Sequence, residues 1–163
     1  MLPLAPMKNS ISITQSLPDE AATKAFAAKV AHAINKGAII YLHGPLGAGK
    51  TTFTRGFLSA FNYHDKVKSP TYALVEPYQF GDQFIFHFDF YRLENPDELE
   101  HIGIKEYFFS NAICLIEWPE KGQPLLPSSD LDCYIEFVDK ERSIRIKAHS
   151  LKGEMILQKL KEQ

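Results

Sequence analysis

The fold of this chain is decided by the stretch Gly44-Pro45-Leu46-Gly47-Ala48-Gly49-Lys50-Thr51, which matches the pattern Gly-x-x-x-x-Gly-Lys-[Ser/Thr] at every defined position. Its flanks agree with the match. An apolar run at 38–42 has the length of a buried strand, and aromatic residues recur at helical spacing over 51–61. Strand, glycine loop and helix in this order predict a P-loop, a turn that binds the phosphates of a nucleotide.

The residue types of the loop suit an anion. Gly44, Gly47 and Gly49 allow the backbone to turn with its N–H groups pointing inward, and the following helix adds its positive N-terminal end. Lys50 supplies a charge for the β- and γ-phosphates, worth about 4 kcal/mol for two unit charges about 4 Å apart at an effective dielectric of about 20. The hydroxyl of Thr51 is suited to Mg²⁺.

Two carboxylates follow apolar strand candidates, and both are expected near the phosphates. Asp89 comes after the run 84–88, and Glu117 comes after 113–116. In α/β sheets the carboxyl ends of strands form the ligand crevice, so these acids are candidates for contact with a metal ion or a water. The alternative for each is a solvated acid at a strand end. His87 shares a strand face with Asp89, but one His-x-Asp pair without a third ligand is a weak signal for a metal centre.

Three further residues are candidates with plainer alternatives. Tyr91 and Arg92 could hold Asp89 or a phosphate, or could be surface packing. Thr71 lies in Ser69-Pro70-Thr71-Tyr72, between the P-loop helix and the next strand. A phosphate-sensing switch loop or an ordinary turn would fit that position.

The remaining pattern predicts one α/β domain with a mixed sheet flanked by helices, the architecture of P-loop NTPases. Ser16 is expected to cap a first helix that ends before Gly37, and Asn95 to cap another that ends at Gly103. A last helix is expected at 151–160. The other expected strands are 10–14, 72–78, 83–88, 112–116, 131–138 and 143–148, with hairpin turns at Gly81-Asp82 and Asp139-Lys140.

Composition agrees with a single globular domain over 1–163, with residues 1–9 as a flexible extension. The net charge of -2 gives no general attraction to nucleic acid. Cys114 and Cys133 are far apart in apolar segments, which favours buried free thiols in a reducing compartment. The N-terminus lacks the pattern of a signal peptide and no run reaches the length of a membrane span, so we expect a cytoplasmic protein.

Four blocks in a fixed order resemble the bacterial TsaE family, also called YjeE. They are 44–52, Ser69-Pro70-Thr71-Tyr72, His87-Phe88-Asp89-Phe90-Tyr91-Arg92-Leu93 and Ile116-Glu117-Trp118-Pro119. The resemblance implies a P-loop ATPase that uses ATP and Mg²⁺ and is needed to form N6-threonylcarbamoyladenosine in tRNAs reading codons that begin with adenine. It also implies two partner proteins, TsaD and TsaB, of which TsaD carries out the transfer, so that contact with tRNA is indirect.

The resemblance also implies roles for individual residues. Thr51 and Glu117 would bind Mg²⁺, Asp89 would lie near the γ-phosphate or its water, and Trp118 would lie beside the site. Glu20 and Arg142 match positions that approach the nucleotide. The loop residues expected to wrap the phosphates are Gly47, Ala48, Gly49, Lys50, Thr51 and Thr52, and the expected catalytic residues are Lys50, Asp89 and Glu117.

Other functions of a P-loop remain as alternatives. A small-molecule kinase usually has an arginine-rich lid, and no such stretch links the four arginines of this chain. A GTPase would need an Asn-Lys-x-Asp motif, which is absent. A non-catalytic module with a nucleotide that only fixes its shape would have little need of both Asp89 and Glu117. No arginine finger is evident in cis, so turnover is expected to be slow without partners.

Overall fold

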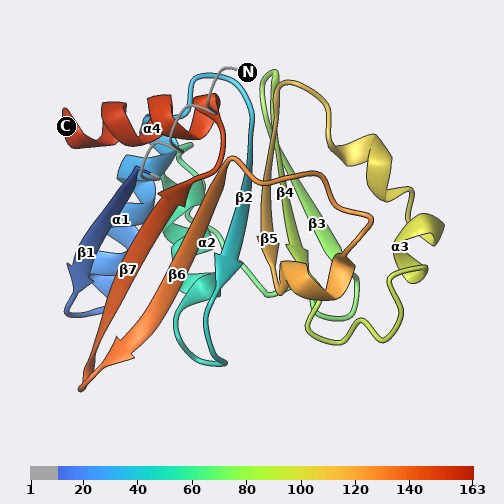
Figure 1. Cartoon of the computed structure of the whole chain (residues 1–163), viewed down its shortest axis with the longest axis horizontal. Coiled ribbons are helices and arrows are strands. Elements are labelled where there is room, and N and C mark those ends of the chain that lie inside the picture. The colour runs from blue at the N-terminus through green and yellow to red at the C-terminus, as the bar shows by residue number, and fades with distance from the viewer. Residues whose placement is uncertain (1–10) are drawn as a thin grey trace, which may run out of the picture.

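A seven-stranded mixed sheet in the order β1-β7-β6-β2-β5-β4-β3 organises the molecule (Figure 1). The computed structural model describes residues 11–163, so the extension expected at 1–9 lies outside the described residues. The strands are β1 (Ser12–Leu17), β2 (Ala38–His43), β3 (Val75–Phe80), β4 (Gln83–Asp89), β5 (Ala112–Glu117), β6 (Leu131–Val138) and β7 (Glu141–Ala148). The helices are α1 (Glu20–His32), α2 (Lys50–Ser59), α3 (Glu98–His101) and α4 (Leu151–Lys161), with short 3-10 helices η1 (Ile104–Tyr107) and η2 (Pro119–Gly122).

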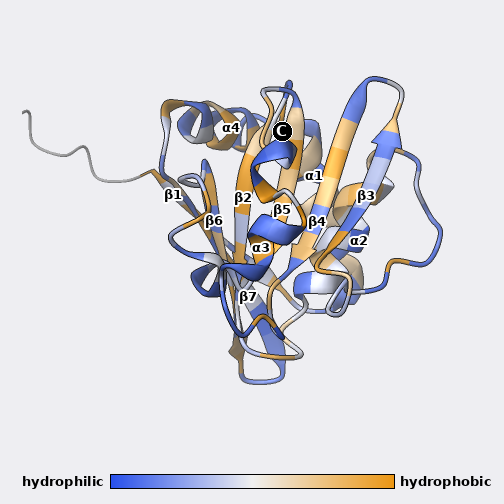
Figure 2. Ribbon diagram, turned by 90° about the vertical axis from the view of Figure 1, so that its right-hand side faces the viewer, coloured by the Kyte–Doolittle hydropathy of each residue, from blue (hydrophilic) through white to orange (hydrophobic). Residues whose placement is uncertain are grey.

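The centre of the sheet is parallel and its two sides are antiparallel. β2 pairs in parallel with both β5 and β6, and β4 pairs in parallel with β5. β3 joins β4 as a hairpin, while β7 pairs antiparallel with β6 and β1. Parallel strands are normally buried on both faces, which is why β2 and β5 are nearly continuous apolar runs (Figure 2). The predicted mixed α/β sheet is therefore confirmed.

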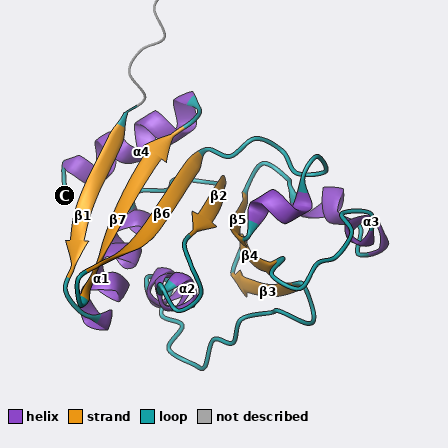
Figure 3. Ribbon diagram, turned by 60° about the horizontal axis from the view of Figure 1, so that its bottom comes forward, coloured by secondary structure: helices purple, strands orange, loops and turns teal. Residues whose placement is uncertain are grey.

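Two apolar cores lie on opposite faces of the sheet. The first contains apolar residues of α1, α2 and α4 and the inward side chains of β2, β6 and β7. The second contains the opposite side chains of β4 and β5, together with Leu99 of α3 and Ile104 of η1. In Figure 3, α3 lies near the β4 and β5 side of the sheet, well away from α1. Among the described residues, no helix combines the length and the apolar character needed to cross a membrane.

The helices α1 and α2 touch through a glycine. A Cβ added to Gly56 would lie 2.4 Å from the Cα of Lys24 and 2.5 Å from its carbonyl oxygen. Real side chains do not approach backbone atoms this closely, so only glycine allows the two helices this separation. The close packing fixes α2, whose first turn carries the end of the predicted P-loop.

An acidic residue on β6 is held by two histidines. Asp132 accepts from His43 Nε2 at 2.6 Å and from Ser129 Oγ at 2.7 Å, and His149 Nε2 lies 2.8 Å from its second oxygen. Burial raises the pKa of Asp132. The hydrogen bonds from His43 and Ser129 and the electrostatic effect of the two histidines together outweigh it, so that the pKa lies below its ordinary value of 3.8. The cluster joins the end of β2 to β6, next to the loop that begins at Gly44.

Three local predictions were wrong at element ends. Ser16 does not cap α1: it pairs with Ser143 inside β1, and the cap is Asp19, whose side chain accepts from Ala22 N at 2.8 Å. The strand expected from 72 begins only at Val75, because residues 71–73 form a turn. The helix expected after Asn95 is only one turn long, Glu98–His101. The first strand, expected at 10–14, also runs three residues further and ends at Leu17. The boundaries of the other expected strands, of the helix at 51–61 and of the last helix lie within about two residues of the observed ones.

Candidate functional site

The P-loop connects β2 to α2 with an open backbone cradle. Gly47 has a φ of 79° and Gly49 a φ of 110°, values that favour glycine. A Cβ at either position would meet nothing within 4 Å, so the backbone conformation and not lack of space calls for glycine there. Gly44 is needed for another reason, since its Cβ would lie 2.6 Å from the carbonyl oxygen of Ile135 on β6. The loop therefore depends on glycine at all three positions.

The loop lysine is buried and already holds internal partners. Lys50 is 5% exposed, and its Nζ donates to the carbonyl oxygens of Gly44 at 2.5 Å and Pro45 at 3.1 Å. The same nitrogen lies 4.4 Å from the centroid of the Trp118 ring. Burial holds the pKa of Lys50 below its ordinary value, although Glu117 and two further nearby carboxylates act to raise it. The ammonium group is thus held over the loop by contacts that a phosphate would replace.

The two strand-end acids lie side by side, because β4 and β5 are adjacent and parallel. Asp89 and Glu117 are register partners and are 4% and 3% exposed. Thr51 Oγ1 in the first turn of α2 lies 3.5 Å from Glu117 Oε2. A hydroxyl and a carboxylate at this separation, facing a phosphate loop, are suited to share one hard divalent cation.

The carboxylate of Glu117 has a buried partner that sequence reasoning considered only as a metal ligand. His87 Nε2 lies 2.6 Å from Glu117 Oε2, and the His87 side chain is fully buried. Its Nδ1 has no hydrogen-bond partner in the described structure. Residues 11–163 contain no group of three His, Cys, Asp or Glu side chains that could hold a metal ion. The contact that the structure gives His87 is thus with the carboxylate of Glu117.

Asp89 is held in place by the loop that precedes β3. Ser69 Oγ and Thr71 Oγ1 both donate to Asp89 Oδ2, the latter at 3.0 Å. The backbone N–H of Tyr91 donates to Oδ1 at 2.9 Å. Arg92 does not reach this carboxylate, because its guanidinium lies 4.6 Å from the centroid of the exposed Tyr72 ring. The role of Thr71 as a switch residue remains a prediction, but its hydroxyl does join the segment to the site.

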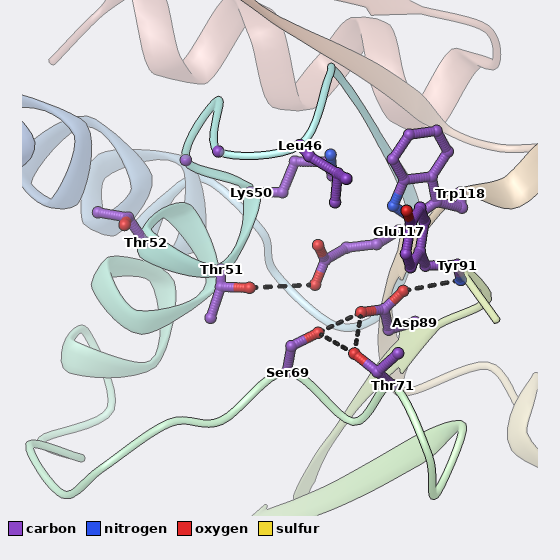
Figure 4. Close-up of a pocket in the computed structure, with 12 residues that line it drawn as sticks. Leu46, Lys50, Thr51, Thr52, Ser69, Thr71, Asp89, Tyr91, Glu117 and Trp118 are labelled. Carbon is purple, nitrogen blue, oxygen red and sulfur yellow. Dashed lines mark hydrogen bonds between the residues drawn. The ribbon is translucent and has the colours of Figure 1, made fainter.

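Lys50, Thr51, Asp89 and Glu117 open onto one cavity of about 300 Å³ (Figure 4). This volume is within the usual range for small-molecule sites. The P-loop forms one wall, the ends of β4 and β5 form another, and Trp118 closes one side. The lining residues are Leu46, Gly47, Gly49, Lys50, Thr51, Thr52, Ser69, Thr71, Asp89, Tyr91, Glu117 and Trp118.

A second hollow of about 220 Å³ lies on the other flank of the loop. It shares Gly47, Gly49 and Thr52 with the first cavity and is lined also by Glu20 and Arg142. Arg142 Nε donates to the carbonyl oxygen of Ala48 at 3.1 Å, and its terminal nitrogen donates to that of Gly47 at 3.2 Å. Of the two residues that the resemblance suggested, Arg142 on β7 therefore contacts the P-loop, and Glu20 at the start of α1 lines the hollow beside it.

Sequence reasoning missed two polar partners and one cation of the site. The partners are Ser69 for Asp89 and His87 for Glu117. The cation is Lys121, whose Nζ lies 5.1 Å from the centroid of the Tyr91 ring and 6.0 Å from that of Trp118. The signal for His87 was present, since a buried strand in which a histidine lies two residues before an acid needs a hydrogen-bond partner on a neighbouring strand.

Comparison with known proteins gives one consistent result. The model of the family described as "Threonylcarbamoyl adenosine biosynthesis protein TsaE" matches residues 17–146. The tRNA threonylcarbamoyladenosine biosynthesis protein TsaE of Haemophilus influenzae is 46% identical over 151 residues, covering 90% of this chain and 96% of that protein. The protein of the same name from Bacillus subtilis is 38% identical over 144 residues, covering 88% and 89%.

A solved structure agrees with the observed fold. The crystal structure of Bacillus subtilis YdiB superposes with a TM-score of 0.81 at 29% identity, covering 95% of this chain and 97% of that one. The matched region of the family model contains the P-loop, the Ser69–Thr71 segment and both strand-end acids. On the extent of these matches, the chain belongs to the TsaE family of threonylcarbamoyladenosine biosynthesis proteins.

Proposed function

We propose that this protein is a Mg²⁺-dependent ATPase that supports the formation of N6-threonylcarbamoyladenosine in tRNAs reading codons that begin with adenine. It acts in the cytoplasm with the TsaD and TsaB proteins and meets tRNA only through them. Membership of the TsaE family supports the pathway. The observation that carries the ATPase activity is the single cavity in which Lys50 and Thr51 face Asp89 and Glu117.

The residues present fit ATP and Mg²⁺. The open cradle at Gly47 and Gly49 offers backbone N–H groups to phosphate oxygens, and the N-terminal end of α2 adds its positive dipole. Lys50 would exchange its carbonyl contacts for the β- and γ-phosphates. Thr51 and Glu117 would hold the metal ion, which supplies charge neutralisation on the phosphates when bound. The second hollow, with Glu20 and Arg142, would take the nucleoside side of the ligand.

The hydrolytic role falls to Asp89. Its carboxylate is fixed by three hydrogen bonds from Ser69, Thr71 and Tyr91, yet it still lines the cavity. A carboxylate fixed in this way is suited to orient a water for attack on the γ-phosphate. The cavity lining contains no arginine, and removal of an arginine finger typically costs about 10³–10⁵ in rate. We therefore expect the isolated protein to be slow and its partners to accelerate it.

The kinase alternative has less support. Of the four arginines, Arg92 contacts the Tyr72 ring and Arg142 donates to two P-loop carbonyl groups. Arg55 donates to the carbonyl oxygen of Val67, and Arg145 lies over the Tyr134 ring. None lines the cavity beside Lys50 as a lid over the phosphates would. The non-catalytic module remains the better competitor, because it shares every binding contact with the ATPase.

The test compares Lys50→Ala, Asp89→Asn and an exposed acid variant, Asp97→Asn, on the full chain. ATP turnover and threonylcarbamoyladenosine in tRNA are measured with purified TsaD and TsaB, and Mg-ATP affinity by calorimetry. Lys50→Ala should lose affinity and activity, by about 100-fold or more in rate. Asp89→Asn should keep affinity and lose turnover, while Asp97→Asn should resemble the unaltered protein. Unchanged turnover in Asp89→Asn would remove Asp89 from catalysis, and no ATP turnover by the unaltered protein with its partners would favour the non-catalytic module. Absence of ATP-dependent modification would exclude the proposed role.

A further inference from the structure

The C-terminal helix leaves an apolar face without a partner in the described chain. Leu151 is 73% exposed and Met155 is 65% exposed. They are four residues apart on α4, so they lie on the same side of the helix, one turn from each other. Large apolar side chains exposed as a pair mark interaction surfaces more often than single ones do. The flexible thioether of Met155 adapts readily to the shape of a partner.

This face borders a hollow of about 680 Å³, which we call the α4 groove. Leu151, Met155 and Ile156 form its apolar side, and Gly37 and Ser110 at the start of β2 and β5 form its end. A Cβ on Gly37 would lie 2.3 Å from the carbonyl oxygen of Ser110, so this end is tightly packed. The end of the groove is thus formed by closely packed backbone at the start of two central strands, β2 and β5.

The rim of the α4 groove carries charge of one sign. Lys36, Lys152 and Lys159 line it, and no Asp or Glu is among the lining residues. Lysines of this kind attract carboxylates and repel other cations. An apolar strip with a basic rim is complementary to an apolar strip with an acidic rim.

We propose that the α4 groove docks an amphipathic helix of a partner protein, with apolar side chains four residues apart and Asp or Glu beside them. The spacing of Leu151 and Met155 matches the anchors of a helix lying in a groove. A second copy of this chain would bring lysine rim against lysine rim in a two-fold arrangement. Residues 1–10 contain Lys8 and no acid, so they lack the charge complementarity as well.

The α4 groove and the P-loop lie at opposite ends of β2. The strand begins at Ala38, beside the groove, and ends at His43, directly before the loop (Figure 1). Six residues of strand span about 20 Å. A helix docked on α4 would therefore leave the nucleotide cavity open, and the proposal does not depend on ATP hydrolysis.

The test uses a synthetic fluorescent peptide of 18 residues with leucines at helical spacing and flanking glutamates. Its control has every glutamate replaced by lysine. Binding to the full chain is measured by anisotropy and mapped by NMR. We expect only the acidic peptide to bind, with shifts at α4 and near Gly37. Leu151→Ser and Met155→Ser should each weaken binding of the acidic peptide by about 10-fold, because each variant loses one large apolar side chain that the complex would bury. Val138→Ser, which changes an exposed apolar residue on β6, should alter it less than about 2-fold.

Several results would overturn the proposal. These are no binding at 1 mM peptide, equal binding of both peptides, or equal binding by the serine variants. Dimerisation lost in Leu151→Ser would identify a second copy as the occupant. Tighter peptide binding after removal of residues 1–10 would identify that segment. Mg-ATP affinity measured on the same variants should stay unchanged, so a failure here is distinct from a failure of the ATPase proposal.

Discussion

The contact between His87 and Glu117 leads to a quantitative prediction about the carboxylate that we propose as a ligand of Mg²⁺. Both side chains are almost fully buried, and His87 Nε2 lies 2.6 Å from Glu117 Oε2. The other neighbour of this carboxylate, Thr51 Oγ1, is at 3.5 Å, the edge of hydrogen-bond distance. Removing His87 would therefore leave a buried carboxylate with one weak partner.

The expected cost follows from that geometry. A hydrogen bond to a charged group contributes about 1.5–3 kcal/mol, and breaking a buried pair costs about 3–5 kcal/mol because one charge stays uncompensated. For His87→Ala we expect a loss of about 3 kcal/mol in the free energy of unfolding. For a chain of this size, each kcal/mol lowers Tm by about 2–4 °C.

The assay is a double-mutant cycle in urea with His87→Ala, Glu117→Ala and both together. We expect a coupling energy of about 1.5–3 kcal/mol, and weaker Mg-ATP binding in His87→Ala, since Glu117 loses its fixed orientation. His87→Gln is the matched control, because its amide nitrogen reaches about as far as Nε2. His87→Asn reaches only as far as Nδ1 and should not rescue. A coupling below about 0.5 kcal/mol, or equal behaviour of the Gln and Asn variants, would refute the positioning role.

Three further outcomes are expected elsewhere in the molecule. Gly56→Ala should destabilise the protein by about 1–3 kcal/mol in urea, because its Cβ would strike the backbone of Lys24; an unchanged midpoint would contradict this packing. Burial raises the pKa of Cys114 to about 12 and also raises that of Cys133, so neither thiol should react quickly with a disulfide reagent at pH 8 until the chain is unfolded. The folded pKa of Asp132 lies below 3.8; its contribution is therefore present above that pH and lost as pH falls through the folded value. The stability difference between the native chain and Asp132→Asn should shrink from about pH 5 to pH 2, and a difference that grows would reverse the assignment.

The parts of the site that the sequence predicted are those with local causes. The P-loop was predictable because its glycines, Lys50 and Thr51 act within one strand, one turn and one helix. Asp89 and Glu117 were predictable as residues of the ligand crevice, because the carboxyl ends of strands form that crevice in α/β sheets. The expected roles of Asp89 and Glu117 in catalysis and metal binding stay predictions, since both roles require a bound nucleotide.

The parts that sequence reasoning missed depend on contacts between distant segments. Ser16 has the residue type of a helix cap, but its pairing with Ser143 keeps it in β1, and Asp19 caps the helix instead. Ser69 gave no sign that it would reach Asp89, twenty residues away. The partner of His87 required the order of β4 and β5, which local periodicity does not contain.

The order of the strands has a consequence for how the protein is made. Among the described residues, β1 pairs only with β7, and this partner comes last of the seven strands in the sequence, at Glu141–Ala148. Arg142, which supports the P-loop carbonyl groups, lies on the same late strand. During synthesis, the first strand must therefore wait for β7 to leave the ribosome before it finds its neighbour. Long-range pairing of this kind slows folding, so the P-loop should gain its support from Arg142 only after this late strand has been made.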